Sequence, residues 1–232
     1  MALKPGAGIP LATYMFMKIN SIVILMLTAL VGAENTFAQK PFSEGTIVYH
    51  VQLSAPDNRS FKGSYVFSFK NGQIRKELKL DNGYTDVTLI NANRNKIYSL
   101  QERDGKKFAI ELSMADMLNK QQKFKGYTLT GETKNAEPLA GQNVYKATIM
   151  YRDSTTSEIL YNKDWKPEIP YTWNRFPDAQ FMPLRFAYKE DNGISMVFIA
   201  DKMEPGPVVT SIFNIPKDHM MISYDEYKQL SK

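Results

Sequence analysis

Apolar and polar residues alternate with a period of two along most of the chain after residue 39, as expected for half-buried β-strands. In the first such segment, Ile47, Tyr49 and Val51 share one face of the predicted strand, and His50 and Gln52 lie on the other. The alternation recurs in residues 65–69, 74–80, 108–112, 145–151, 184–188 and 194–200. The pattern predicts a mainly β protein.

Four Asn-Gly or Asp-Gly pairs lie between these segments and predict hairpins. They are Asn71-Gly72, Asn82-Gly83, Asp104-Gly105 and Asn192-Gly193. Such pairs suit type I′ turns, in which both central residues need a positive φ. Because hairpins join antiparallel neighbours, we expect an antiparallel sheet of about ten to eleven strands, in a barrel or a sandwich.

Two short helices are predicted among the strands. The first follows Ser113 and places Met114, Met117 and Leu118 on one side. The second follows Ser223, which has Glu226 at the spacing of a capping box. We expect one or both helices to cover the sheet.

Residues 165–183, here called the aromatic segment, contain both tryptophans and four of the twelve prolines. Proline cannot donate ladder hydrogen bonds, so this segment is predicted to be a loop, and loops beyond about 12–15 residues are usually functional. Its rings could form the aromatic lip of an apolar ligand site, with the methionines and leucine of the first helix lining the same cavity. The candidate ligand-binding residues are Trp165, Tyr171, Trp173, Phe176, Phe181, Met114, Met117 and Leu118.

The N-terminal residues resemble a secretory signal peptide. Residues 19–31 are an apolar run that follows Lys18 and precedes the small residues of Thr36-Phe37-Ala38. This run is shorter than the roughly 20 apolar residues of a membrane span. We expect translation to start at Met17, cleavage to follow Ala38, and residues 39–232 to be a single β-rich domain exported to the periplasm or the medium, without stable membrane insertion.

The chain contains no cysteine, which excludes disulfides, a thiol nucleophile and the lipid-accepting cysteine of a bacterial lipoprotein. We therefore expect a soluble protein that is not lipid-anchored. The net charge is +5, and lysines and arginines are interspersed with acidic residues. No basic run indicates a nucleic-acid partner.

Catalytic motifs are not recognisable in the sequence. The two histidines, His50 and His219, have no companion at the spacing of a metal site. No nucleophile elbow, P-loop or dinucleotide-binding glycine motif is present. We therefore predict a protein that is not an enzyme and uses no metal or cofactor. A hydrolase with two carboxylates stays open as an alternative, since such a pair need only meet in space.

Several segments resemble a family of exported bacterial proteins of unknown function with a LolA-like fold, the fold of lipoprotein carriers. The clearest matches are residues 139–146 (LAGQNVYK) and 213–216 (FNIP), and residues 42–53, 66–78, 181–198 and 213–227 follow the family's order of strands and turns. The resemblance implies an open antiparallel half-barrel with a concave side covered by helices. It also implies a scaffold for apolar ligands such as acyl chains.

Two functions therefore remain as hypotheses beside the hydrolase. The first is a non-enzymatic periplasmic or secreted protein that binds a lipid or another apolar ligand on the concave face. The second is a structural or assembly accessory of the cell envelope that binds a partner protein through an edge strand or the aromatic segment.

Overall fold

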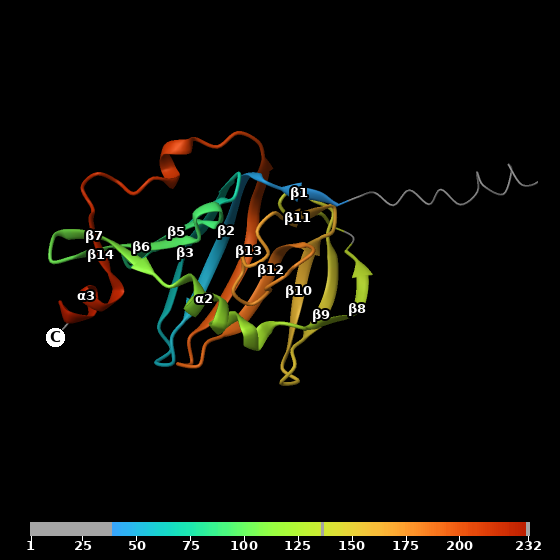
Figure 1. Ribbon diagram of the computed structural model, residues 1–232. Coiled ribbons are helices and arrows are strands. Elements are labelled where there is room, and N and C mark those ends of the chain that lie inside the picture. The colour runs from blue at the N-terminus through green and yellow to red at the C-terminus, as the bar shows by residue number, and fades with distance from the viewer. Residues whose placement is uncertain (1–38, 136, 231–232) are drawn as a thin grey trace, which may run out of the picture. The chain divides into compact units, whose positions relative to one another are not determined.

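The computed structural model describes residues 39–135 and 137–230 (Figure 1). The predicted leader and its cleavage site after Ala38 lie outside the described residues. From Gln39 onward the chain forms one compact unit. Within the described residues, no helix is long and apolar enough to cross a membrane.

Twelve of the described strands form one open sheet, in the order β14-β7-β6-β5-β4-β3-β2-β13-β12-β10-β9-β8. All neighbours in this sheet are antiparallel except β14 and β7, and the short strands β1 and β11 form a separate parallel pair. The strands are β1 (Lys40–Phe42), β2 (Glu44–Ser54), β3 (Ser60–Lys70), β4 (Gln73–Leu80), β5 (Thr85–Asn91), β6 (Lys96–Arg103), β7 (Lys106–Leu112), β8 (Thr128–Lys134), β9 (Tyr145–Met150), β10 (Thr156–Asn162), β11 (Trp165–Pro167), β12 (Met182–Lys189), β13 (Ser195–Pro205) and β14 (Met220–Ser223). The predicted mainly β, open antiparallel architecture is confirmed. The strands beyond the predicted ten or eleven include β1, β11 and β14, which are too short to show an alternation.

The hairpin predictions are confirmed, but only two of the four turns fit the expected type. Asn71-Gly72 and Asp104-Gly105 have a positive φ at both residues. At the other two pairs only the glycine does, and the side chains of Asn82 and Asn192 accept hydrogen bonds from the backbone two residues later. These side-chain contacts favour a longer loop that ends in a left-handed glycine over the two-residue type I′ turn.

The sheet is irregular at three positions, which bends strands. The pairing register shifts at Ala200/Lys202 between β13 and β2, at Leu160/Tyr161 between β10 and β12, and at Thr130/Thr133 between β8 and β9. The face that carries Tyr49, Phe67 and Ile74 holds the main core. We call this face the concave face.

Both predicted helices are confirmed. Helix α2 (Met114–Gln121) begins after Ser113, whose hydroxyl accepts a hydrogen bond from the Asp116 backbone N–H, and it continues into the 3₁₀ turn η2 (Gln122–Phe124). The chain that leads from β7 through α2 to β8 crosses in front of the strands in Figure 1. Helix α3 (Tyr224–Gln229) has the predicted capping box. It packs on the edge of the sheet, where the ring centroids of Tyr227 and Phe108 are 5.8 Å apart.

The segment between β13 and β14 runs along the opposite face of the sheet and contains the 3₁₀ turn η3 (Thr210–Phe213). Lys70 Nζ donates to the Val208 carbonyl at 2.7 Å, and Arg75 donates to the Ile212 carbonyl at 3.2 Å. A third 3₁₀ turn, η1 (Ala92–Arg94), joins β5 to β6. The segment between β13 and β14, here called the C-terminal strap, delivers β14 to the edge of the sheet beside β7, and α3 follows it.

Candidate functional site

The candidate site is a hollow between helix α2 and strands β3 to β7, here called the concave cavity. Its volume is about 440 Å³. The sheet contributes Lys76, Ile90 and Leu112 among others, and α2 contributes Met117 and Lys120. The volume lies within the range of roughly 300–1,000 Å³ that is usual for small-molecule sites.

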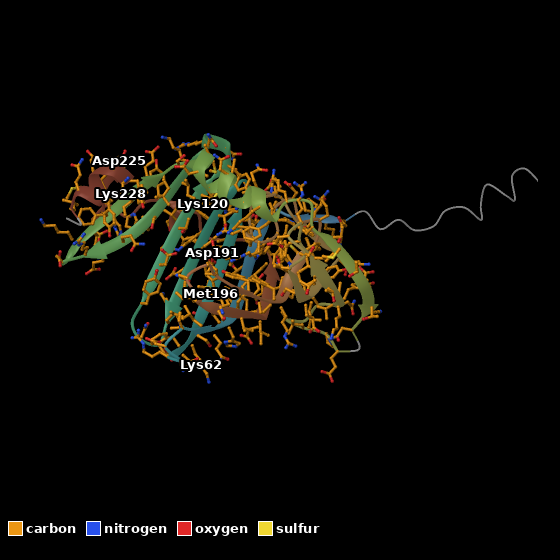
Figure 2. All side chains as sticks on the ribbon, turned by 90° about the horizontal axis from the view of Figure 1, so that it is seen from below. Lys62, Lys120, Asp191, Met196, Asp225 and Lys228 are labelled. Atoms are coloured by element: carbon orange, nitrogen blue, oxygen red, sulfur yellow. The ribbon has the colours of Figure 1, made fainter. Side chains whose placement is uncertain are left out.

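A second hollow, of about 460 Å³, lies along the other side of α2. Met117, Lys120 and Asn174 border both hollows, so the two meet at the helix. Lys120 and Asp191 border this second hollow. Figure 2 shows these two residues near one another and Lys62 at a distant end of the strands. A small inner cavity of about 40 Å³ lies next to the concave cavity, and Lys76 and Asn174 border both of them.

Lys76 is the unusual residue of this site. It lies in β4 between Ile74 and Leu78 on the concave face, at a position where the alternation calls for an apolar side chain, and it is only 6% exposed. It forms no hydrogen bond or ion pair with any described residue, and its ammonium lies 5.4 Å from the centre of the Phe67 ring. Burial lowers the pKa of Lys76 to about 8, and the Asp86 carboxylate opposes this shift.

Asp86 is the anionic counterpart on the same floor. The register pairs Thr88 with Lys76 and Asp86 with Leu78, so the side chains of Thr88 and Asp86 lie on the concave face of β5. Asp86 accepts a hydrogen bond from Gln101 at 3.1 Å, and burial raises the pKa of its carboxyl group. It is not ion-paired with Lys76, so two opposite charges lie separately in a cavity whose walls are partly apolar and partly polar.

Helix α2 is fixed to the site by its two ends. Met114 packs into the core at the start, and Gln121 is buried at the end. The Gln121 side-chain amide donates to the Tyr171 carbonyl at 3.3 Å and to the Asn174 side chain at 3.1 Å. Gln121 Oε1 is buried and lacks a partner among the described residues. The helix is therefore tied to the aromatic segment as well as to the sheet.

The aromatic segment is a loop as predicted, but it folds inward instead of forming an open lip. Trp173, Phe176 and Phe181 are buried in the core. The Trp173 ring stacks on Phe67 at 5.6 Å, and the Phe176 ring meets Phe186 edge-on at 5.2 Å. The prediction that these three rings form the lip of a site was wrong. Large aromatic side chains gain more free energy by packing on the concave face than by facing water.

The other predicted ligand-binding residues are divided between the β1–β11 pair, the core and the concave cavity. Trp165 and Tyr171 are half-buried, and Trp165 packs edge-on against Phe42 beside the β1–β11 pair. Met117 is half-buried and borders the concave cavity, while Met114 and Leu118 pack against the core. The structure thus brings Met117, Trp173 and Phe176 to the hollows or the inner cavity, and it does not bring Trp165 there.

Four residues of the site were not predicted from the sequence: Lys76, Asp86, Thr88 and Asn174. A signal for Lys76 was present, because a lysine stands within the apolar stripe of residues 74–80. The other three carry no comparable signal, since threonine is common within strands and polar residues near strand ends and in loops are usually solvated.

The histidines and carboxylates give no metal site within the part of the chain that the structure describes, where no group of three or more His, Asp or Glu side chains could hold an ion. His50 lies on the outside with its Nε2 3.3 Å from Asp201. Two carboxylates, from Asp86 and Asp116, border the concave cavity. Two more, from Glu190 and Asp191, border the second hollow. The hydrolase hypothesis requires such a pair of carboxylates to face one pocket.

The site and the sheet define the chain as an open antiparallel half-barrel with a hollow concave side, which agrees with the predicted LolA-like fold. No protein-family model matches the chain, and no curated protein matches it. Among solved structures, it is similar to an uncharacterized conserved protein from Thermus thermophilus, with a TM-score of 0.44, 12% identity, and coverage of 78% of this chain and 92% of the other. It is also similar to a LolA superfamily protein from Nitrosomonas europaea, with a TM-score of 0.38, 11% identity, and coverage of 76% and 92%.

Proposed function

We propose that this protein is an exported, non-enzymatic binding protein that holds a lipid or another apolar ligand between the concave face and helix α2. The main support is the concave cavity of about 440 Å³ and its continuation into the second hollow of about 460 Å³. The cavity walls include Ile90, Leu112 and Met117, which offer an acyl chain apolar contact.

Burial of apolar surface supplies the affinity in this proposal. At about 25 cal/mol per Å², a few hundred Å² of contact gives several kcal/mol before the costs of ordering are subtracted. Helix α2 has only eight residues, and isolated helices of that length are marginal in water. Its place therefore depends on tertiary contacts, which are the burial of Met114 and the hydrogen bonds of Gln121.

Native mass spectrometry of the purified protein, with extraction of bound lipids, tests this proposal. We expect an apolar molecule to be retained at a ratio near one to one, or to be taken up when fatty acids or phospholipids are added. A protein that is isolated empty and takes up none of these compounds would contradict the proposal. Fractionation of producing cells tests the proposed export, which predicts protein lacking residues 1–38 outside the cytoplasm.

A second function, the envelope accessory that binds a partner protein, is favoured by the edge strand β14. Met220 and Met221 of this strand are 54% and 59% exposed, and Tyr224 and Leu230 nearby are 52% and 54% exposed. Exposed apolar residues on a sheet edge suit strand addition by a partner. In the same mass spectra, a stoichiometric protein partner without bound lipid would favour this second function over the first.

A further inference from the structure

We propose that the ligand is a carboxylate-terminated apolar chain, and that Lys76 receives its carboxylate at the inner end of the concave cavity. This inference rests on the proposed function, because it names the chemical class that the same site would bind. The observation behind it is a lysine that is more than nine-tenths buried, has no hydrogen bond or ion pair with any described residue, and borders two adjoining cavities.

A buried ammonium without a partner costs free energy. An apolar side chain at position 76 would complete the stripe that Ile74 and Leu78 begin, so the fold does not need a lysine there. A bound anion would supply the missing partner. Charge-assisted hydrogen bonds between an ammonium and a carboxylate are about twice as strong as neutral ones.

Other donors lie beside Lys76. Thr88 is its direct neighbour across β4 and β5, and the Thr88 hydroxyl forms no hydrogen bond with a described side chain or backbone group. The Asn174 side chain accepts from Gln121 through its oxygen, which leaves its amino group free to donate. A carboxylate at Lys76 would thus have donors for both of its oxygens.

The charge balance favours a monoanion. Asp86 lies on the same floor and contributes negative charge to the surroundings of Lys76. Asp86 would repel a phosphate dianion about twice as strongly as a carboxylate monoanion, and Lys76 is the buried cation of the site. The apolar chain would extend from Lys76 along Ile90, Ile97 and Met117, beneath helix α2.

Direct binding measurements on the purified protein test this assignment with dodecanoate and with dodecan-1-ol, which has the same chain and no charge. We expect the wild-type protein at pH 7 to bind dodecanoate at least ~10-fold more tightly than dodecan-1-ol. Lys76→Met keeps the length of the side chain and removes the charge. It should abolish the preference for dodecanoate while binding of dodecan-1-ol persists, which also shows that the variant is folded.

Lys62→Met is the matched control, since Lys62 is exposed on the opposite face of β3 and lies far from Lys120 in Figure 2. It removes one positive charge and should leave the preference intact. The wild-type preference should also fall between pH 7 and pH 9.5 as Lys76 releases its proton. Other charged or titratable groups also face the site: Tyr65 on β3, Asp86 on β5, Asp116 and Lys120 on α2, Arg175 in the aromatic segment, Tyr188 on β12 and Tyr224 on α3. Any pH dependence that remains in Lys76→Met comes from these groups, and the part that is lost comes from Lys76.

The outcomes distinguish this inference from the proposed function. Equal affinity of the wild-type protein for the two compounds, or a preference that survives in Lys76→Met, would overturn the role of Lys76 and leave apolar binding in place. Failure of the wild-type protein to bind either compound would overturn the role of Lys76, and the proposed function would also fall if phospholipids were not taken up in the mass spectra. The comparison of two ligands with the wild-type protein requires no variant, so it holds even if Lys76→Met does not fold.

Discussion

The burial of Lys76 predicts how the stability of the protein depends on pH. Its native pKa is about 8, whereas an unfolded lysine titrates near about 10.4. Between these values the unfolded chain holds a proton that the native state has released, so the free energy of unfolding should rise with pH, by about 2 kcal/mol from pH 8 to pH 9.5. Lys76→Met should flatten this rise and be more stable than the wild type at pH 7, by up to about 3 kcal/mol.

Urea denaturation of the two proteins at pH 7, 8 and 9.5 measures this difference. The measurements stop below pH 10 so that tyrosine ionisation does not obscure the effect of Lys76. Burial raises the pKa of Tyr151 and Tyr188 to about 12 in the native state. Unfolded tyrosines ionise near about pH 10, so these two residues lower the free energy of unfolding only as the pH approaches that value. A wild-type rise equal to that of the variant would show that Lys76 is not buried as a free ammonium.

Trp173 and Trp165 allow a second prediction at this scale. Trp173 is 3% exposed and stacks on Phe67, so Trp173→Ala should lower the free energy of unfolding by about 3–5 kcal/mol. Trp165 is half-buried in the β1–β11 pair, so Trp165→Ala should lower the free energy of unfolding by less than Trp173→Ala does. Circular dichroism during chemical denaturation compares the two variants. Equal losses would mean that the Trp173 ring does not fill the core.

At the scale of the element, α2 depends on its attachment to the aromatic segment. Gln121→Ala removes the hydrogen bonds to Tyr171 and Asn174, each worth about 1 kcal/mol. We expect backbone amides of α2 to exchange with deuterium about 10-fold faster, with little change in the strands. Asn119→Ala on the exposed side of the same helix is the control. Unchanged exchange in Gln121→Ala would show that packing of Met114 and Leu118 on the core keeps the helix in place without the Gln121 hydrogen bonds.

Most strands and both helices could be predicted, because their signals are local. Alternation in residues 47–53 or 194–200 and the capping box at Ser223 depend only on neighbouring residues. The pairing of β14 with β7 could not be predicted, since it joins residues 220–223 to residues 108–111 in parallel and depends on the path of the C-terminal strap. The turn types at Asn82 and Asn192 also escaped prediction, because Asn-Gly is compatible with more than one loop.

The candidate site was predictable only in part, because most of its contacts join residues from different strands and loops. Met117 was found because helical spacing puts it on the side that faces the sheet. The aromatic segment was recognised as unusual, but its inward course depends on the contact of Trp173 with Phe67 of β3, more than 100 residues earlier in the sequence. The contacts with β12 and β10 are closer in sequence but still depend on how those strands pair in the sheet. Lys76 and Thr88 become neighbours only through the register of β4 and β5.

At the scale of the whole molecule, the two halves of the concave face have different contents. Rings of the aromatic segment fill the half over β3, β12 and β10, where Trp173, Phe176 and Phe181 lie in the core. The half over β4 to β7 is left hollow beneath α2. Lys76 borders both the inner cavity among the rings and the concave cavity, so it lies at the boundary between the halves.

This asymmetry gives the proposed ligand a direction. The filled half excludes an apolar chain, because interiors packed with aromatic side chains leave little free volume. An acyl chain with its carboxylate at Lys76 would therefore extend toward β6 and β7, where Ile97 and Leu112 provide apolar contact. Tyr224 of α3, which directly follows the exposed residues of β14, also borders the concave cavity. A partner docked on the exposed edge of β14 would therefore lie next to a residue that borders the proposed ligand site.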